Sequence, residues 1–162
     1  MNETPRSVTV YCSSSSAVEP HFADEARSLG RAIAAAGLEF VYGGGSIGLM
    51  GQSARSCKAH GGRVVGIITA KLDELEGGWR GCDELQIVEG MQERRARMMD
   101  LGVAFDVLPG GLGTYEEFFE VLVGRQLGDH HKPIVIVNQN GYYEPLIAMV
   151  DHGIEHKFIR PA

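Results

Sequence analysis

Short apolar runs alternate with segments of helical spacing along most of the chain. Runs rich in β-branched and aromatic residues predict strands at 8–12, 38–42, 63–68, 84–88, 103–108 and 133–137. Helical patterns predict helices at 20–36, 48–60, 91–101, 114–127 and 143–150, whereas 69–81 is expected to be a loop. The alternation predicts a single α/β domain over residues 1–162, in which a parallel sheet is covered by helices on both faces.

The turn after the fifth predicted strand carries the clearest chemical signal. Pro109 is followed there by Gly110, Gly111, Gly113 and Thr114, and a helix is expected to begin at Thr114. A glycine-rich turn that opens a helix leaves backbone N–H groups free at the positive end of the helix dipole, where phosphate binds well. Because ligands of parallel sheets bind beyond the carboxyl ends of the strands, we expect this loop at the binding site.

Glu117 lies three residues after Thr114, and this spacing has two interpretations. In the first, Thr114 caps the helix and Glu117 reaches back to the N–H of the cap residue, as in a capping box. In the second, Glu117 is functional, and it must then point away from the bound phosphate, because a carboxylate would repel it. An acid directed toward the sugar would suit chemistry at the anomeric carbon of a 5′-phosphorylated nucleoside.

Composition and charge narrow the classes of partner. The chain has 162 residues, of which 44% are hydrophobic, and its formal net charge is −6. Such an acidic chain is not expected to be a general nucleic-acid binder, so an anionic ligand would depend on locally placed arginines. The apolar runs are too short to span a membrane, and residues 1–5 lack a signal-peptide pattern, so we expect a cytoplasmic protein without membrane association.

A second glycine-rich turn follows the second predicted strand. Gly43, Gly45 and Gly48 match the spacing of the dinucleotide fingerprint, but this turn does not follow the first strand, and no acidic residue ends the next strand. Close approach of the backbone to a ligand or to the neighbouring loop explains these glycines without a dinucleotide. Gly44, Gly45 and Ser13 are candidates for lining the site because of their position after strands.

The helix predicted after the fourth strand carries three arginines. Arg97 lies four residues after Glu93 and is assigned to a surface ion pair, while Met91 is expected to contact the core. Arg94 and Arg95 remain candidates for ligand binding, because the guanidinium fork can bind a ribose hydroxyl, a phosphate or a carboxylate. The alternative for both is a solvated basic face.

No metal site is expected. His152, Glu155 and His156 fit the H-x-x-E-H pattern of some zinc enzymes, but Gly153 should weaken the helix that such ligands need, and no third ligand follows downstream. The cysteines share no metal-ligand or redox spacing, and we expect small buried or half-buried residues at Cys12, Cys57 and Cys82.

Three segments together resemble one family: G-G-G-S-I-G-L-M-G at 43–51, M-x-x-R-R-x-x-M at 91–98, and P-G-G-x-G-T-x-x-E at 109–117. They are similar to the LONELY GUY family, the cytokinin riboside 5′-monophosphate phosphoribohydrolases, formerly labelled lysine decarboxylases, and the similarity runs from Val8 to Pro161. The resemblance implies hydrolysis of the N-glycosidic bond of a nucleoside 5′-monophosphate, such as AMP or its N6-prenylated form. It also implies a doubly wound, Rossmann-like fold, a homodimer with sites near the interface, and no cofactor.

The resemblance also implies roles for individual residues. Arg94 and Glu117 match the family's catalytic pair, and Arg95 and Glu76 match substrate-contacting positions. The resemblance also assigns substrate binding to the loop residues Gly110, Gly111, Gly113 and Thr114.

The chain departs from the family pattern in three places. Ser13 stands where the family usually has glycine, Val123 and Gly124 replace a usual Thr-Trp pair, and relatives continue into a further strand and helix beyond Ala162. The change at Val123 is expected to remove a polar contact to the substrate and to alter base preference.

Two other functions are weighed against hydrolysis. A carrier of a nucleotide or of the molybdenum cofactor would share the fold and the glycine loops, but it would not need the pairing of Arg94 with Glu117. A decarboxylase should require pyridoxal phosphate and a Schiff-base lysine. No supporting motif surrounds any of the four lysines, which are Lys58, Lys71, Lys132 and Lys157.

Overall fold

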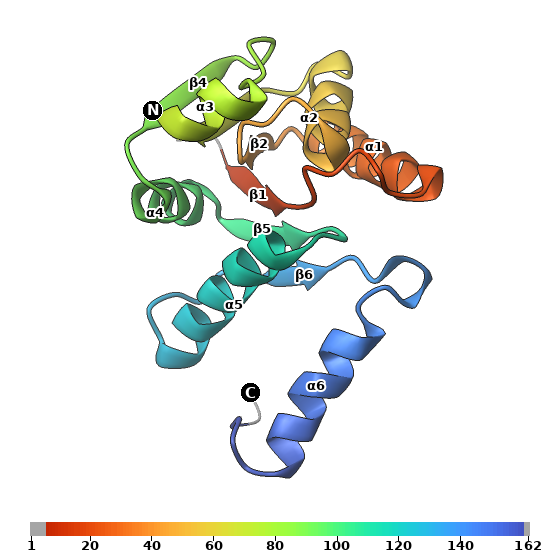
Figure 1. Cartoon of the computed structure of the whole chain (residues 1–162), viewed down its shortest axis with the longest axis vertical. Helices are drawn as coiled ribbons and strands as arrows, with labels where there is room; N and C mark the ends of the chain where they lie inside the picture. The colour runs from red at the N-terminus through yellow and green to blue at the C-terminus, as the bar shows by residue number, and fades with distance from the viewer. Residues whose placement is uncertain (1–5, 161–162) are drawn as a thin grey trace.

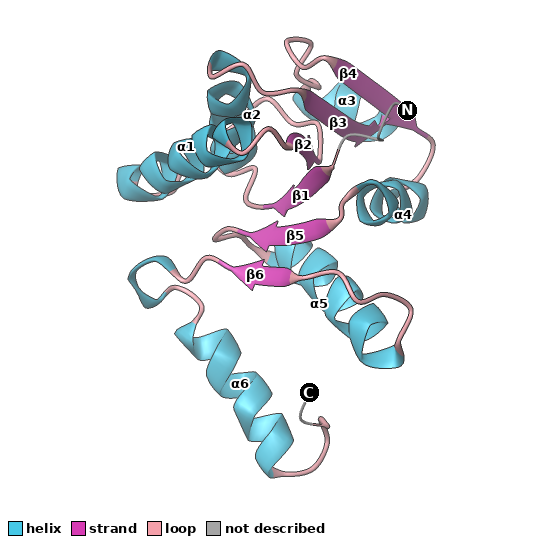
Figure 2. Cartoon of the chain, turned by 180° about the vertical axis from the view of Figure 1, so that it is seen from behind, coloured by secondary structure: helices cyan, strands magenta, loops and turns pink. Residues whose placement is uncertain are grey.

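The computed structural model describes residues 6–160 and places six parallel strands in one sheet (Figure 1 and Figure 2). The strands are β1 (Ser7–Tyr11), β2 (Glu39–Tyr42), β3 (Val64–Thr69), β4 (Glu84–Val88), β5 (Ala104–Val107) and β6 (Ile134–Ile136). The helices are α1 (Pro20–Ala35), α2 (Gly48–Ala59), α3 (Ala70–Glu76), α4 (Met91–Leu101), α5 (Leu112–Leu127) and α6 (Glu144–Glu155), with a short 3-10 helix, η1 (Gln139–Gly141). Residues 1–5, which lack a signal-peptide pattern, lie outside the described residues.

The strand order β4-β3-β2-β1-β5-β6 confirms the doubly wound parallel sheet. The chain builds outward from β1 to β4, then returns to place β5 on the other side of β1, so β1 pairs with both β2 and β5. In such sheets the carboxyl ends of the two strands at this reversal form a crevice. The loops after β1 and β5 are therefore placed to build a site together.

Alternation along the strands divides the core into two layers. Val8 and Val10 of β1 face one side with residues of α1 and α2, whereas Tyr11 and Val41 face the other side with residues of α4 and α5. Successive side chains of a strand point to opposite faces, so each central strand supplies both layers. This explains why the strand patterns are almost continuously apolar.

Two predicted segments were wrong. The segment 69–81, expected to be a loop, contains α3, which begins where Thr69 Oγ1 accepts a hydrogen bond from Leu72 N at 3.2 Å. The last helix was predicted to end at Val150 but continues through Gly153 to Glu155. A side chain at 153 would collide with Ile159, since a Cβ there would lie 2.6 Å from Ile159 Cδ1. A side chain at 153 would therefore require the Ile159 side chain to move.

Helix α6 extends away from the β6 edge of the sheet in both views (Figure 1 and Figure 2). None of its residues is buried, and Leu146 near its beginning packs partly against the core. Within residues 6–160, no helix combines the length and the apolar character that crossing a membrane would require.

Candidate active site

A cleft of about 320 Å³ lies at the reversal of the sheet. Its walls come from the segments that follow β1, β2 and β5, from the end of β3, and from α3 and α4. The lining residues are Cys12, Ser13, Ser14, Ser15, Gly43, Gly45, Met50, Ile68, Leu72, Glu76, Met91, Arg94, Gly111, Leu112, Gly113, Thr114, Glu116 and Glu117.

One end of the cleft is the N-terminus of α5. The first bond of the helical ladder is donated by Tyr115 N to Gly111 O at 3.0 Å, so the N–H groups of Leu112, Gly113 and Thr114 have no partner within the helix. A Cβ built at Gly111 or Gly113 meets no other atom within 4 Å. The loop is therefore open on the side where an anion would approach.

The capping-box interpretation of Thr114 and Glu117 is wrong. Helix α5 begins at Leu112, two residues earlier than expected, and its N-cap is Gly111, which has no side chain. Thr114 lies inside the first turn and is buried. Glu117 instead lines the cleft, and its Oε1 lies 3.8 Å from Arg94 Nη1.

Arg94 is fixed by backbone carbonyls. Its Nε donates to Ile67 O at 2.9 Å and its Nη2 donates to Gly43 O at 2.9 Å, while the residue is only 6% exposed. Two of the three guanidinium nitrogens are therefore bound to the ends of β3 and β2. The third, Nη1, is the one that lies toward Glu117.

In the glycine-rich turn after β2, Gly43 and Gly48 pack closely against protein atoms. A Cβ at Gly43 would lie 2.1 Å from Arg94 Nη2, although Gly43 is not among the glycines with positive φ. Its identity is therefore explained by space and not by backbone conformation. Gly48 has φ +61°, and a Cβ there would lie 2.4 Å from the backbone carbon of Ser14. The predicted close approach of this turn to a neighbouring loop is confirmed.

Burial governs the ionisation of Glu117. The side chain is 11% exposed, and desolvation raises the pKa of Glu117 to about 7, against an ordinary value of 4.5. The charge of Arg94 lowers this pKa, and Glu116 raises it, but neither effect is as large as desolvation. Near neutral pH the carboxyl group is therefore divided between its two protonation states, as suits a group that exchanges protons.

Cys12 lines the same cleft but is not suited to act as a nucleophile. Burial raises the pKa of the Cys12 thiol well above its ordinary range, and the nearby Glu117 carboxylate raises it further. The reactive form of cysteine is the thiolate, which this environment disfavours. Cys12 and Cys57 are buried and Cys82 is half-buried, as predicted, and all three are free thiols.

The structure separates the remaining candidate residues into two groups. Ser13, Gly45 and Glu76 line the cleft. Gly44 and Gly110 do not, and a Cβ at Gly110 would lie 2.1 Å from Thr114 Oγ1, so this glycine allows the loop to close on itself.

The three arginines of α4 have different surroundings. Arg95 is outside the cleft lining, with Nη1 3.0 Å from Glu116 Oε1 and Nε 2.9 Å from Glu120 Oε2. The predicted ion pair of Arg97 with Glu93 is confirmed at 3.0 Å. Only Arg94 of the three lines the cleft.

The apolar wall of the cleft was not predicted from the sequence. Met50, Ile68, Leu72 and Met91 line it, and the expectation that Met91 contacts the core was wrong, since it is 39% exposed. Leu72 was missed because α3 was expected to be a loop. A signal was available, since Thr69 is a favoured N-cap residue and several good helix formers follow it.

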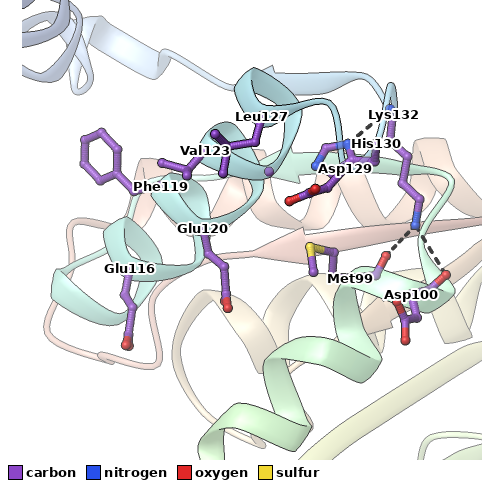
Figure 3. Close-up of a pocket in the computed structure, with 11 residues that line it drawn as sticks. Met99, Asp100, Glu116, Phe119, Glu120, Val123, Leu127, Asp129, His130 and Lys132 are labelled. Atoms are coloured by element: carbon purple, nitrogen blue, oxygen red, sulfur yellow. Dashed lines mark hydrogen bonds between the residues drawn. The ribbon is translucent and has the colours of Figure 1, made fainter. Parts of the chain in front are cut away.

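A second, more open depression of about 640 Å³ lies between α4 and α5 (Figure 3). Phe119, Val123 and Leu127 of α5 line it, and the last two are 48% and 73% exposed. Glu116 lines both this depression and the cleft. The apolar face of α5 therefore lies directly beside the cleft.

The sequence is similar to those of known proteins over most of its length. Residues 50–162 match the family described as "Possible lysine decarboxylase". A cytokinin riboside 5′-monophosphate phosphoribohydrolase of Rhodococcoides fascians is 45% identical over 160 residues, which cover 98% of this chain and 81% of the relative. A cytokinin riboside 5′-monophosphate phosphoribohydrolase of Oryza sativa subsp. japonica is 39% identical over 154 residues, covering 95% of this chain and 64% of the relative.

A solved structure of the molybdenum cofactor carrier protein from Chlamydomonas reinhardtii is also similar. It superposes with a TM-score of 0.74 at 19% identity, and the match covers 93% of this chain and 87% of that one. At this identity the similarity shows a shared fold alone.

Proposed function

Because the chain belongs to the LONELY GUY family of phosphoribohydrolases, we propose that it hydrolyses the N-glycosidic bond of a nucleoside 5′-monophosphate. The substrates are AMP or its N6-prenylated form, and the products are the free base, adenine or a cytokinin, and ribose 5-phosphate. One observation carries this proposal: the buried Glu117 lies beside Arg94 in a cleft whose end is an open helix N-terminus.

The open loop suits the phosphate. The N–H groups at 112–114 lie at the positive end of α5, and the helix dipole adds to their attraction for an anion. Glu117 lies one turn further along α5, so the sugar of a nucleotide bound by its phosphate would reach the carboxylate. Glu76 and the apolar wall remain available to the base.

Glu117 and Arg94 have different roles in the proposed hydrolysis. As the bond between C1′ and the base nitrogen breaks, its electron pair goes to the base and positive charge develops on the sugar, which the Glu117 carboxylate stabilises. Glu117 accepts a proton from the attacking water, whose oxygen bonds to C1′. The two protons of water end on the sugar hydroxyl and on the base. Arg94 holds the carboxylate in place and contacts the ribose or phosphate.

The surroundings of the lysines argue against the decarboxylase description. None of the four lysines lines the cleft. Lys58 Nζ is paired with Asp83, and Lys132 Nζ donates to Met99 O at 2.6 Å. A Schiff base needs an amine inside the site, beside the substrate.

The decisive experiment is an assay of base release. The protein is incubated with AMP and with N6-isopentenyl-AMP, and the free base is separated by chromatography. Glu117→Gln should lower kcat by about a hundredfold or more, because one well-placed electrostatic group contributes on the order of 3 kcal/mol.

Binding distinguishes a catalytic role from a structural one. Glu117→Gln should still bind AMP in calorimetry, and the matched change Glu93→Gln, on the surface of α4, should leave turnover unaffected. Full activity in Glu117→Gln would remove Glu117 from the mechanism. AMP binding without base release by the parent protein would favour a carrier.

We further propose that the enzyme is a cytoplasmic homodimer. Free thiols at all three cysteines suit a reducing compartment. The exposed Val123 and Leu127 form an apolar face on α5 that a second copy would cover, and Glu116 links this face to the cleft (Figure 3). A partner seated there would lie close to the bound nucleotide.

Oligomeric state is measured by light scattering on the purified chain. Leu127→Asp should convert dimers to monomers, because it would bury a charge at the interface. Leu75→Asp is the matched control, since Leu75 is equally exposed at 69% but lies on α3. A parent protein that is monomeric at micromolar concentration contradicts the homodimer.

A further inference from the structure

The end of α6 carries a cluster of metal-ligating side chains far along the chain from the cleft residues. His152, Glu155 and His156 occupy positions i, i+3 and i+4, which share one helix face. One ligand atom of each lies within 4.8 Å of the others, and the two imidazole rings are 4.3 Å apart between centroids. All three side chains are exposed, so an ion could reach them without displacing the core.

The backbone holds this turn in place. The N–H groups of Phe158 and Ile159 both donate to Gly153 O, at 2.9 and 3.0 Å, and Lys157 N donates to Ile154 O at 3.0 Å. These bonds form a Schellman-type ending, in which the chain turns back over the last helical turn. Gly153 was expected to weaken the helix that the ligands need, but α6 continues through it, and its carbonyl accepts two bonds of this ending.

Donor chemistry selects the class of ion. Imidazole nitrogens combined with one carboxylate suit Zn²⁺, Ni²⁺ or Cu²⁺, whereas Mg²⁺ and Ca²⁺ prefer sites built from oxygen alone. Three protein donors leave at least one coordination position for water or another ligand.

We propose that His152, Glu155 and His156 bind a divalent transition-metal ion, represented by Zn²⁺, at the end of α6. The ion is not part of nucleotide hydrolysis, because no residue of α6 lines the cleft. Its structural effect is local: coordination joins two successive turns and stabilises the end of an otherwise exposed helix.

The test uses the full chain and Zn²⁺ in competition with a chromophoric chelator, with Co²⁺ absorption as a second readout of coordination. We expect one ion per chain. His152→Ala and His156→Ala should each weaken binding by at least about tenfold, the smallest loss that even a supporting contact of a metal site typically causes. Both positions are exposed and alanine favours helix, so the variants should fold.

A histidine elsewhere provides the control. His131→Ala removes an exposed histidine outside the cluster and should leave Zn²⁺ affinity unchanged. In hydrogen exchange, Zn²⁺ should slow the amides of residues 156–159 in the parent but not in the double variant of His152 and His156. Equal affinity in the parent and the double variant overturns the proposal.

Discussion

The two glycine-rich loops follow parallel strands and open helices in the same way, yet some of their glycines have contrasting surroundings. Behind β2, Gly43 and Gly48 are each in contact with protein, with Arg94 in one case and the Ser14 backbone in the other. Behind β5, Gly111 and Gly113 have open space where a side chain would be. In the proposed mechanism, the turn at 43–48 therefore supports Arg94, and the loop at 110–114 receives the phosphate. Glycine content alone therefore does not locate a ligand site; open glycines that also line a cleft are the better indication.

The largest expected effect is on stability, because the carboxyl group of Glu117 is buried beside the loop at 110–114. Folding raises the pKa of Glu117 from 4.5 to about 7, so the folded state binds this proton more tightly than the unfolded state. The associated stability is present below pH 4.5 and is lost as pH rises through 7. A shift of this size corresponds to about 3 kcal/mol.

Glu117→Gln removes this dependence. Relative to the parent, the variant should gain about 2.5 kcal/mol of unfolding free energy at pH 8 compared with pH 5. Urea denaturation at the two pH values measures the difference. A parallel pH dependence in both proteins would mean that Glu117 is not desolvated in the folded state.

The second effect concerns the turn after β2, at 43–48, and shows whether its packing against Arg94 supports catalysis. Gly43→Ala would place a Cβ 2.1 Å from Arg94 Nη2 and displace the guanidinium from its position beside Glu117. A displacement of roughly 1 Å at a catalytic group can cost up to a hundredfold, so we expect kcat to fall by about ten- to a hundredfold. The pH at which kcat/KM rises should also move upward, because Arg94 lowers the pKa of Glu117.

Gly90→Ala is the matched control for this variant. Gly90 precedes α4 with φ −138°, and a Cβ there meets nothing within 4 Å. It should retain the parent's kcat and pH profile. If Gly43→Ala also retains the parent's kcat and pH profile, the supporting role assigned to the turn after β2 is wrong.

The third effect appears when one methyl group is added to each loop, at Gly48 after β2 and at Gly111 after β5. Gly48→Ala should cost about 2 kcal/mol or more of stability, because the site has φ +61° and meets backbone atoms. Gly111→Ala should leave stability within about 0.5 kcal/mol. It should instead weaken AMP binding by roughly tenfold, since the methyl group would occupy the side from which phosphate approaches. Thermal unfolding measures the loss of stability in Gly48→Ala, and calorimetry measures the loss of AMP affinity in Gly111→Ala. Equal changes of stability and affinity in the two variants would contradict the difference proposed between the loops.

The smallest expected effect on stability comes from backbone conformation alone. Lys157 has φ +64° in the turn after α6, a conformation that glycine adopts without strain. Lys157→Gly should therefore stabilise the fold by up to about 1 kcal/mol. Thermal unfolding measures this gain, and a loss of stability would show that the lysine side chain compensates for the strain.

The fold could be predicted because local pattern and global topology agree. The bounds of β4 and the start of α4 were predicted to the residue, since clear turn residues flank them. Helix α3 was missed because it is short and none of its residues is buried, so it lacks the apolar stripe on which the prediction relies. The start of α5 was misjudged because Thr114 resembles a cap residue, whereas Gly111 fills that role.

The site could be predicted in part. Among the candidates from the sequence, Arg94, Glu117 and most of the loop at 110–114 line the cleft, whereas Gly110 does not. The sequence could not separate Arg95 from Arg94. A helix turns by about 100° between neighbouring residues, so one of them must face elsewhere, and only the packing of α4 on the sheet decides which. Arg95 lies beside Glu116 and Glu120 as a result.

The pairing of β1 with β5 also affects how this protein acquires its activity. Val8 and Thr9 of β1 pair with Ala104 and Phe105 of β5, and Ser13 N donates to Pro109 O at 3.2 Å beside the cleft. Contacts between such distant segments form slowly, because a long loop must close before they are gained. The proposed nucleotide site is thus incomplete in a nascent chain until its two halves have docked, and nucleotide binding during refolding would report the completion of the sheet.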